Sequence, residues 1–555
     1  MSTLDTPPLQ TFRMSLTIAR SLALIGFLFL MLRLAWVGDD ALITMRAALN
    51  SSHGWGVGFN VTESVQAYTH PLWFVLWSLI GSITGEWILT IMLLGIVLSL
   101  LSVLLILMTL KSVPAVLGGA MLLAFSNAFM EYTASGLENP LGWVFLGLLT
   151  LGLANAYKSG SAMGLKQGIL LGLALAGLFL TRFDLVLLVF AMLLVTLWVQ
   201  RRNVKFLVSG FLAAVVPAVI WFAWSWTSYH SLLPNTFYAK QNLEIPFHEV
   251  IIQGFRYFWV STDFDPITSA VVIVGSLVLL LMGTTFFRAG VLGVLLYLAY
   301  VIYIGGDFMA GRFLAAPFYL TLLLIALFFT ANSSWGAKTQ PVGGERSHNN
   351  MLRVGLVSLA ILGTLFVGGR APIAVLTPTD VRWLDQDQAN IYDTRSKFIT
   401  LDKGLDQWLM TLREPLQQPT FSSVAAVNSV APLRDIRAAA NAWPNFDSDL
   451  MRKATWPNSD GSLNLLPTDV GVICGLLGAN SILTGPTVHW IDTCALSDRF
   501  LAGIPYESDG YRWFVGHYVR GLPQGYAEAV SEGDANLVVD PMEKDRLIKL
   551  WEQIR

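Results

Sequence analysis

Charged residues are scarce in this chain, and their scarcity excludes most classes of soluble protein. Asp, Glu, Lys and Arg make up only 13% of the 555 residues, whereas hydrophobic residues make up 54% and the mean hydropathy is +0.58. Soluble domains carry about 25% charged residues. Disordered chains are poor in apolar residues, so that class is excluded as well. The composition therefore predicts an integral membrane protein.

Cysteine and an excess of positive charge are also lacking. Two cysteines are too few for a disulfide scaffold or a multi-cysteine metal centre. The formal net charge of −2 argues against nucleic acid as a partner, because nucleic-acid-binding domains present a basic surface. Membrane lipid is the partner that the composition indicates.

The charges that are present concentrate in the last third of the chain. The first 368 residues contain 18 Lys+Arg and 14 Asp+Glu, whereas residues 369–555 contain 17 and 23. This shift predicts a transmembrane domain, 1–371, followed by a soluble domain, 372–555. Alternating strand-like and helical patterns in the second part favour a small α/β-type domain. The patterns lie at Ser396–Leu412, Ser422–Val430, Val470–Cys474 and Pro541–Trp551.

Eleven apolar runs are long enough, or nearly so, to cross a bilayer as helices, which takes about 17–25 residues. They predict a polytopic α-helical membrane protein with about 11 spans. The runs are residues 14–37, 87–110, 113–131, 136–156, 164–181, 184–200, 206–229, 268–285, 289–304, 312–331 and 352–368.

The basic residues between these runs predict the orientation, because Lys and Arg concentrate in cytoplasmic loops. Basic residues precede the first run and occupy the connections at 158–166, 201–205 and 338–353. All of these segments are cytoplasmic only if the chain crosses eleven times. Pro71–Gly85 then lies along the outer interface, or dips into the membrane and returns, and the C-terminal domain lies outside. Cys474 and Cys494 would meet oxidising conditions there, either bonded to each other or as two buried thiols.

Ionisable residues gather at one end of the predicted spans. A charge at membrane depth is costly, so each such residue is a candidate for function. In the predicted topology these residues lie at the outer ends of apolar runs, whereas helix caps alone would fall on both faces. The set comprises Asp39, Asp40, His70, Glu138, Arg182, Asp184, Lys240, Asp307 and Arg312.

Grouped cations at this depth indicate an anionic ligand, and a lipid phosphate is the anion that lies there. A neighbouring carboxylate indicates a proton transfer or a sugar hydroxyl as its partner. Simpler interpretations stay open, since Asp39 and Asp40 would cap a helix and Arg182 with Asp184 would form a structural ion pair. A divalent cation would fit if Asp39, Asp40 and Asp307 converged, although their spacing matches no metal-binding signature.

Short motifs within residues 35–320 resemble the GT-C glycosyltransferases, which are multi-span enzymes that use polyprenyl-phosphate sugars. The first outer loop of that superfamily is similar to Asp39–Ile43 and Gly58–Glu63 of this chain. Further motifs resemble the mycobacterial terminal arabinofuranosyltransferases and the related pilin arabinosyltransferases. These motifs are Ala134–Asn139, Arg182, Pro234–Lys240 and Gly305–Arg312 followed by Ala315–Pro317.

The resemblance implies a GT-C-like fold in a bacterial inner membrane, with the active site facing the periplasm. It also implies a polyprenyl-monophosphate donor carrying a pentose, D-arabinofuranose, and an acceptor that is a cell-envelope glycan or a glycoprotein. In that superfamily an acidic residue of the first outer loop is the candidate catalytic base, which carries over to Asp40 or Asp39. The chain departs from the mycobacterial pattern at Tyr68–Pro71 and Arg182–Asp184, so the acceptor stays open.

Sugar transfer of this kind assigns roles to the other ionisable residues. A phosphate leaving group needs fixed positive charge where negative charge grows, and the sugar needs hydrogen-bonding partners. The candidates are Arg182, Lys240, Arg312 and His70 for the donor phosphate, and Glu138, Asn139 and Asp307 for the sugar hydroxyls.

Two other functions remain open. One is a GT-C enzyme that uses another lipid-linked sugar donor. The other is a lipid or sugar transporter, which would also carry charges at membrane depth. Transporters often contain inverted repeats, whereas the sequence has no internal repeat and its charges gather at one face.

Overall fold

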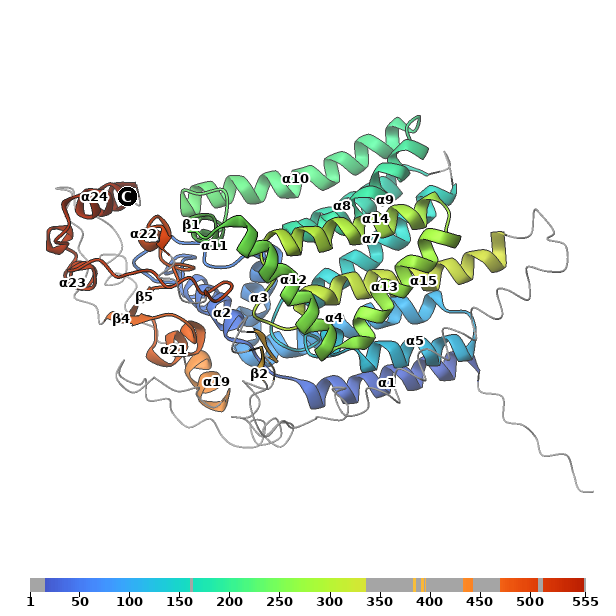
Figure 1. Ribbon diagram of the computed structural model, residues 1–555, viewed down its shortest axis with the longest axis horizontal. Coiled ribbons are helices and arrows are strands. Elements are labelled where there is room, and N and C mark those ends of the chain that lie inside the picture. Colours follow the sequence, from blue (N-terminus) through green and yellow to red (C-terminus); the bar gives the residue numbers. More distant parts are fainter. Residues whose placement is uncertain are drawn as a thin grey trace, which may run out of the picture.

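The computed structural model describes residues 15–159, 163–335, 383–385, 391–393, 395, 433–442, 470–507 and 513–553. Most of these residues are helical, and the long helices form a bundle with the C-terminal elements at one end (Figure 1). The predicted span at 352–368, the predicted elements at Ser396–Leu412 and Ser422–Val430, and the predicted boundary after residue 371 lie outside the described residues.

Six helices among the described residues are long and apolar enough to cross a membrane. A seventh candidate is a pair of helices bent by 110° at their junction. This agrees with the predicted helical membrane protein. The six are α1 (Leu16–Leu34), α4 (Trp87–Thr109), α7 (Asn139–Ser159), α10 (Val204–Tyr229), α14 (Thr285–Tyr303) and α15 (Ala315–Trp335), and the bent pair is α12 (Phe247–Phe264) and α13 (Pro266–Met282).

Three of the eleven predicted spans are shorter apolar helices, α5 (Val113–Phe125), α8 (Leu165–Thr181) and α9 (Val186–Val199), and a fourth, 352–368, lies outside the described residues. A further short apolar helix is α3 (Pro71–Thr84). Ten of the eleven predicted runs coincide with described helices, but α5, α8 and α9 have only 13, 17 and 14 residues. The segment predicted to lie at the interface is the helix α3.

Small residues allow close helix packing within the bundle. A Cβ atom on Gly172 of α8 would overlap the carbonyl oxygen of Gly210 on α10, so the two backbones touch there. Such contacts are typical of helices that associate in lipid. Elsewhere on α10, Phe211, Ile220 and Trp226 are 64%, 63% and 57% exposed. Exposed apolar side chains of this kind suit contact with lipid chains.

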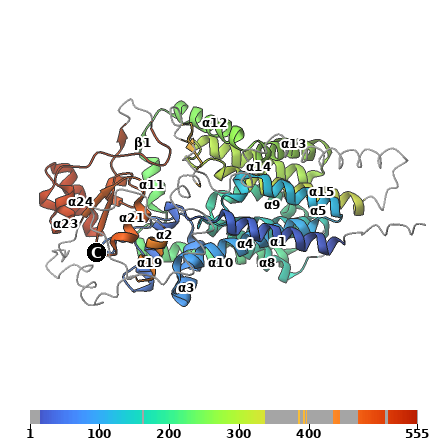
Figure 2. The same cartoon turned by 90° about the horizontal axis from the view of Figure 1, so that it is seen from below.

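The C-terminal elements lie against the loops at one end of the bundle, as the view from below in Figure 2 also shows. The described helices there are α19 (Leu433–Asn441), α21 (Leu477–Thr484), α22 (Arg499–Ala502), α23 (Tyr526–Glu532) and α24 (Pro541–Gln553). The strands pair as β1 (Leu243–Glu244) with β6 (Tyr506–Glu507), β2 (Trp383–Asp385) with β3 (Ile391–Tyr392), and β4 (Val470–Ile473) with β5 (His489–Asp492). Because β1 precedes α12 in the membrane part, the two parts share a sheet.

A parallel strand pair with one crossover helix forms the core of the C-terminal elements. β4 and β5 run parallel and α21 connects them, so the predicted strand at Val470–Cys474 is confirmed. The predicted helix at Pro541–Trp551 is α24. A disulfide joins Cys474 to Cys494, with their Cα atoms 5.1 Å apart, and it decides between the two states that the sequence left open.

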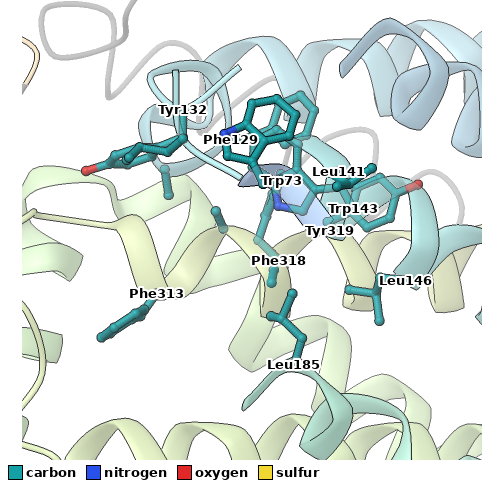
Figure 3. Close-up of a cluster of buried hydrophobic side chains, with 14 of the residues drawn as sticks. Trp73, Phe129, Tyr132, Leu141, Trp143, Leu146, Leu185, Phe313, Phe318 and Tyr319 are labelled. Atoms are coloured by element: carbon teal, nitrogen blue, oxygen red, sulfur yellow. The ribbon is translucent and has the colours of Figure 1, made fainter. Parts of the chain in front are cut away.

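A cluster of buried aromatic side chains supports this end of the bundle (Figure 3). The Phe129 ring lies 4.5 Å from the ring of Trp143 and 6.4 Å from that of Tyr319, between centroids. The Trp73 indole donates to the carbonyl oxygen of Gly136 at 3.0 Å. These contacts fix the loop 131–138, which carries a candidate site residue at its end.

Candidate functional site

Arg312 lies at the centre of a charged cluster that joins segments far apart in the sequence. Its Nη1 atom is 3.5 Å from Asp40 Oδ2 and 3.5 Å from Asp307 Oδ2. Its Nη2 atom is 3.4 Å from Glu138 Oε1. Three carboxylates, from the first turn of α2 (Asp39–Ser52), the loop before α7 and the loop after α14, therefore surround one guanidinium group.

Arg182 forms the second centre of the cluster. Asp184 binds it through two parallel contacts, Nε to Oδ1 at 3.0 Å and Nη2 to Oδ2 at 2.8 Å. Its remaining Nη1 atom donates to Glu138 Oε1 at 3.0 Å, and its guanidinium lies 5.0 Å from the centre of the Phe313 ring. The predicted Arg182–Asp184 pair is therefore present, and it joins the larger cluster through Glu138.

His70 completes the buried side of the cluster. Its Nδ1 atom is 3.3 Å from Glu138 Oε2, and its Nε2 atom is 2.8 Å from Thr44 Oγ1. A hydrogen bond of 2.7 Å between the hydroxyls of Tyr68 and Tyr229 holds the preceding loop. Pro71 then begins α3, as expected for a residue that suits the first helical turn.

Glycines give the loop that carries Asp307 its shape. Gly305, Gly306 and Gly311 have φ angles of +83°, +80° and +73°, which residues with a Cβ atom rarely adopt. A Cβ atom on Gly306 would also overlap Tyr257. The hydroxyl of Tyr257 donates to the carbonyl oxygen of Met309 at 3.2 Å and accepts from the N–H of Phe313 at 3.0 Å. The loop is thus held on both sides of Arg312.

Burial and charge oppose each other at the carboxylates. Burial would raise the pKa of Glu138, but His70, Arg312 and Arg182 outweigh it and lower the pKa to about 2. Burial raises the pKa of Asp307, although Arg312 and Lys240 oppose this shift. Burial also lowers the pKa of His70, with Glu138 opposing. Glu138 is therefore ionised at neutral pH.

Lys240 and Asp40 lie on the open side of the cluster. The side chain of Asp40 is 37% exposed, and Lys240, on α11 (Asn235–Gln241), is exposed as well. Surrounding protein nevertheless lowers the pKa of Lys240, whereas Asp307 and Asp40 raise it. The charges of these two carboxylates therefore act on Lys240, whose side chain is accessible to solvent or to a ligand.

Several buried polar atoms at this place make no hydrogen bond within the described part of the chain. They are Nδ1 of His70, Oε2 of Glu138, Oδ1 of Asn139, Oδ2 of Asp307 and Nε of Arg312. His70 Nδ1 and Glu138 Oε2 face each other at 3.3 Å, and Asp307 Oδ2 lies 3.5 Å from Arg312 Nη1, so these atoms form ion pairs without forming hydrogen bonds. Buried polar atoms in proteins are nearly always satisfied. Their grouping here suits a ligand that carries several hydroxyl or phosphate oxygens.

Asp39 and Asp40 are adjacent in sequence but face different partners. Both begin α2 (Asp39–Ser52). The carboxylate of Asp40 faces Arg312, whereas that of Asp39 accepts hydrogen bonds from the backbone N–H groups of Gly478 and Ala479 at 3.0 and 2.8 Å. Direct contacts therefore join seven of the nine residues singled out from the sequence. Lys240 interacts with Asp307 and Asp40 through its charge, Asn139 follows Glu138 in the chain, and Asp39 contacts α21 instead.

The arrangement does not bring Asp39, Asp40 and Asp307 together as a cation site, because Asp39 is directed to α21. Among the residues that the structure describes, no group of three His, Cys, Asp or Glu side chains is arranged to hold a metal ion.

Tyr392 is a site residue that the sequence did not indicate. Its backbone joins the Asp307 loop, since its N–H donates to the Phe308 carbonyl at 3.1 Å and its carbonyl accepts from Ala310 at 3.2 Å. Burial raises the pKa of its phenol, and the charges of Asp40 and Asp307 raise it further. A lone Tyr in a polar segment carries no pattern that would reveal this contact.

No protein-family model matches the chain, and no curated protein matches it. Function is therefore inferred from the charged cluster and from its place at one end of a membrane bundle.

Proposed function

We propose that this protein is a GT-C-like glycosyltransferase that transfers a pentose, D-arabinofuranose, from a polyprenyl-monophosphate donor to a cell-envelope glycan or glycoprotein. The convergence of charges at one end of the apolar helices carries the proposal. Asp40, Glu138, Arg182, and Asp307 with Arg312 come from four separate connections, and they meet within direct contact distance. Helix caps or surface ion pairs would not collect in this way.

Arg312 and Lys240 suit the donor phosphate. Arg312 makes only long contacts of 3.4–3.5 Å to its carboxylates, and its Nε atom makes no hydrogen bond among the described residues. Lys240 is exposed on α11, and the charges of Asp307 and Asp40 act on it. Both can therefore turn towards a phosphate oxygen as the bond to the sugar breaks and negative charge grows on the phosphate.

Arg182 and His70 support this site from the buried side. Asp184 and Glu138 engage all sides of the Arg182 guanidinium at 2.8–3.0 Å, so its charge stabilises Glu138 and adds a longer-range attraction for the donor. Glu138, Asn139 and Asp307 retain oxygen atoms without hydrogen bonds in the described structure. These atoms suit the hydroxyls of a furanose.

Asp40 is the proposed base. An alcohol is a weak nucleophile, and a carboxylate near its proton assists attack on the anomeric carbon. The exposed carboxylate of Asp40 is accessible to an acceptor while it stays 3.5 Å from Arg312. The acceptor hydroxyl gives its proton to Asp40, its oxygen bonds to the anomeric carbon, and the sugar–phosphate bond breaks to release polyprenyl phosphate.

The proposed topology places this reaction on the periplasmic face. Eleven crossings leave the basic connections in the cytoplasm. The charged cluster and residues 372–555, as a soluble α/β-type domain, then lie outside. Residues 470–507 contact the loops next to the cluster, where an acceptor would approach.

The test is sugar transfer by the purified full-length protein in detergent, with labelled polyprenyl-phosphate arabinose and a cell-envelope acceptor extract. Mass spectrometry of the product identifies the sugar and the acceptor. Transfer without an ion gradient separates an enzyme from a transporter. Other lipid-linked sugars in the same assay test the alternative donor, and a chelator tests whether a divalent cation takes part.

Replacement of Asp40 by Asn should abolish transfer and leave donor binding within about threefold of wild type, because the base is lost and the phosphate contacts remain. Asp545→Asn is the matched control, since Asp545 is exposed on α24. Full transfer activity in Asp40→Asn would refute the role of this carboxylate. A wild-type protein that binds the donor without converting it would refute the enzyme.

A further inference from the structure

The helix α21 lacks an N-terminal cap in its own sequence. The residue before it is Leu476, in a left-handed conformation with φ +53°, and a Leu side chain has no oxygen that accepts a hydrogen bond. Ser, Thr, Asp or Asn normally supplies that oxygen. Here Asp39 supplies it from the membrane part, since its carboxylate accepts from Gly478 and Ala479, the second and third residues of the helix.

The carboxylate of Asp39 also carries the charge that a helix N-terminus favours. Close packing around it shows that α21 and α2 are fitted to each other. A Cβ atom on Gly478 would overlap the carbonyl oxygen of Asp39 and lie 2.8 Å from Leu42 Cβ, so only glycine permits this approach.

A buried arginine holds the same two helices together further along. Arg46, on α2, is 0% exposed and lies over the Phe59 ring. It donates to the backbone carbonyls of Ser481, Gly485 and Val488. These carbonyls belong to the end of α21 and the segment that follows. Contacts at both ends of α21 therefore fix the direction of α2.

Asp40 is the next residue along α2, and its carboxylate faces Arg312 rather than α21. Successive residues on an α-helix are about 100° apart, so a first turn fixed by Asp39 on one side determines where Asp40 lies on the other. The N-terminus of α2 is held between α21 and Arg312.

We infer that Asp39 is a positioning residue: its carboxylate caps α21 and so holds Asp40 at the reacting groups. The inference rests on the proposed function, because Asp40 is its catalytic base. It assigns the two adjacent carboxylates to different tasks, and it makes the docking of the C-terminal segment a requirement for catalysis. Asp39 itself takes no proton from the acceptor.

Three replacements of Asp39 in the full-length protein test this division. Asp39→Ala removes the cap, and we expect kcat to fall about tenfold while the KM for the lipid donor changes less than about twofold. Asp39→Asn and Asp39→Ser keep a capping oxygen without the charge. Both should restore kcat to within about threefold of wild type, whereas Asp40→Asn should remain inactive.

Gly478→Ala tests the same contact from the other side, without changing Asp39. The added methyl group would separate α21 from α2. We therefore expect kcat to fall and the KM for the donor to stay unchanged. Gly521→Ala is the control, because a Cβ atom at Gly521 meets nothing within 4 Å. Gly478→Ala keeps the inference testable if Asp39→Ala fails to fold.

Hydrogen exchange of the peptide that covers 477–484 reports on the cap without any sugar transfer. Asp39→Ala should accelerate exchange at Gly478 and Ala479 by about fivefold to tenfold, and Asp40→Asn should not. Unchanged exchange in Asp39→Ala overturns the inference whatever the activity. An Asp39→Asn protein as inactive as Asp40→Asn also overturns it, because Asp39 would then act on substrate. If exchange is accelerated in Asp39→Ala but the wild-type protein shows no sugar transfer, only the proposed function is refuted.

Discussion

Replacement of Glu138 by Gln should strongly destabilise the protein, although the two side chains have nearly the same shape. Glu138 is 0% exposed and lies 3.0 Å from Arg182, 3.4 Å from Arg312 and 3.3 Å from His70. Gln removes the negative charge, so the buried guanidinium groups of Arg182 and Arg312 lose one of the carboxylates that balance their positive charge. Loss of one partner from a buried ion pair costs about 3–5 kcal/mol.

The pKa of Glu138 gives a second route to the same magnitude. Its ordinary value is 4.5, and the folded protein lowers it to about 2. This difference corresponds to about 3 kcal/mol of stability at neutral pH. Because the folded pKa lies below the unfolded one, the contribution is complete above about pH 4.5. It is lost as the pH falls from about 4.5 to about 2.

The free energy of unfolding is measured by denaturant titration in detergent at pH 7, 5, 4 and 3, with tryptophan fluorescence as the signal. We expect Glu138→Gln to be about 3 kcal/mol less stable than wild type at pH 7. The difference should shrink as the pH approaches about 2. Glu249→Gln is the control, because Glu249 is exposed in the first turn of α12. A Glu138→Gln protein as stable as wild type at pH 7, with the same acid profile, would refute the electrostatic account of the cluster.

Two further replacements test the parts that hold the site in place. Gly306→Ala should destabilise the protein more than Gly54→Ala. Both glycines have positive φ, but only at Gly306 would a Cβ atom overlap a side chain, that of Tyr257; equal thermal midpoints for the two variants would contradict this. Cys474→Ser removes the bond to Cys494, which closes a loop of 20 residues, and should cost about 3 kcal/mol. A denaturation curve of wild type that is insensitive to reductant would contradict the second expectation.

The gathering of ionisable residues at one end of the bundle could be predicted from the sequence, because burial of charge in lipid is so costly. Apolar runs show where the chain can cross, and the connections between them alternate between the two ends of the bundle. Charges that lie only in alternate connections must therefore share an end. Arg182 and Arg312 illustrate this, since both meet Glu138 in the structure.

The division between Asp39 and Asp40 could not be predicted in the same way. Both carboxylates satisfy every rule of composition and spacing, and they differ only in their contacts with residues far away in the sequence. Asp39 binds Gly478 and Ala479, 439 and 440 residues later. The position of Tyr392 could not be predicted for the same reason, since it depends on backbone pairing with the loop at Phe308. Contacts of such separation follow from tertiary packing, which a local pattern does not encode.

The two arginines of the cluster show why geometry decides roles that charge alone leaves equal. Arg182 is held by Asp184 through two short parallel contacts of 2.8 and 3.0 Å, a geometry that is strong and specific. A phosphate would have to break those contacts to reach it. Arg312 has three carboxylates at 3.4–3.5 Å, a distance at which each hydrogen bond is weak. An incoming phosphate can replace these long contacts with shorter ones, and a group that strengthens its contacts as charge develops is the kind that accelerates a reaction. In the proposed reaction, Arg312 would therefore be the better phosphate ligand, whereas Arg182 contacts Glu138 beside it.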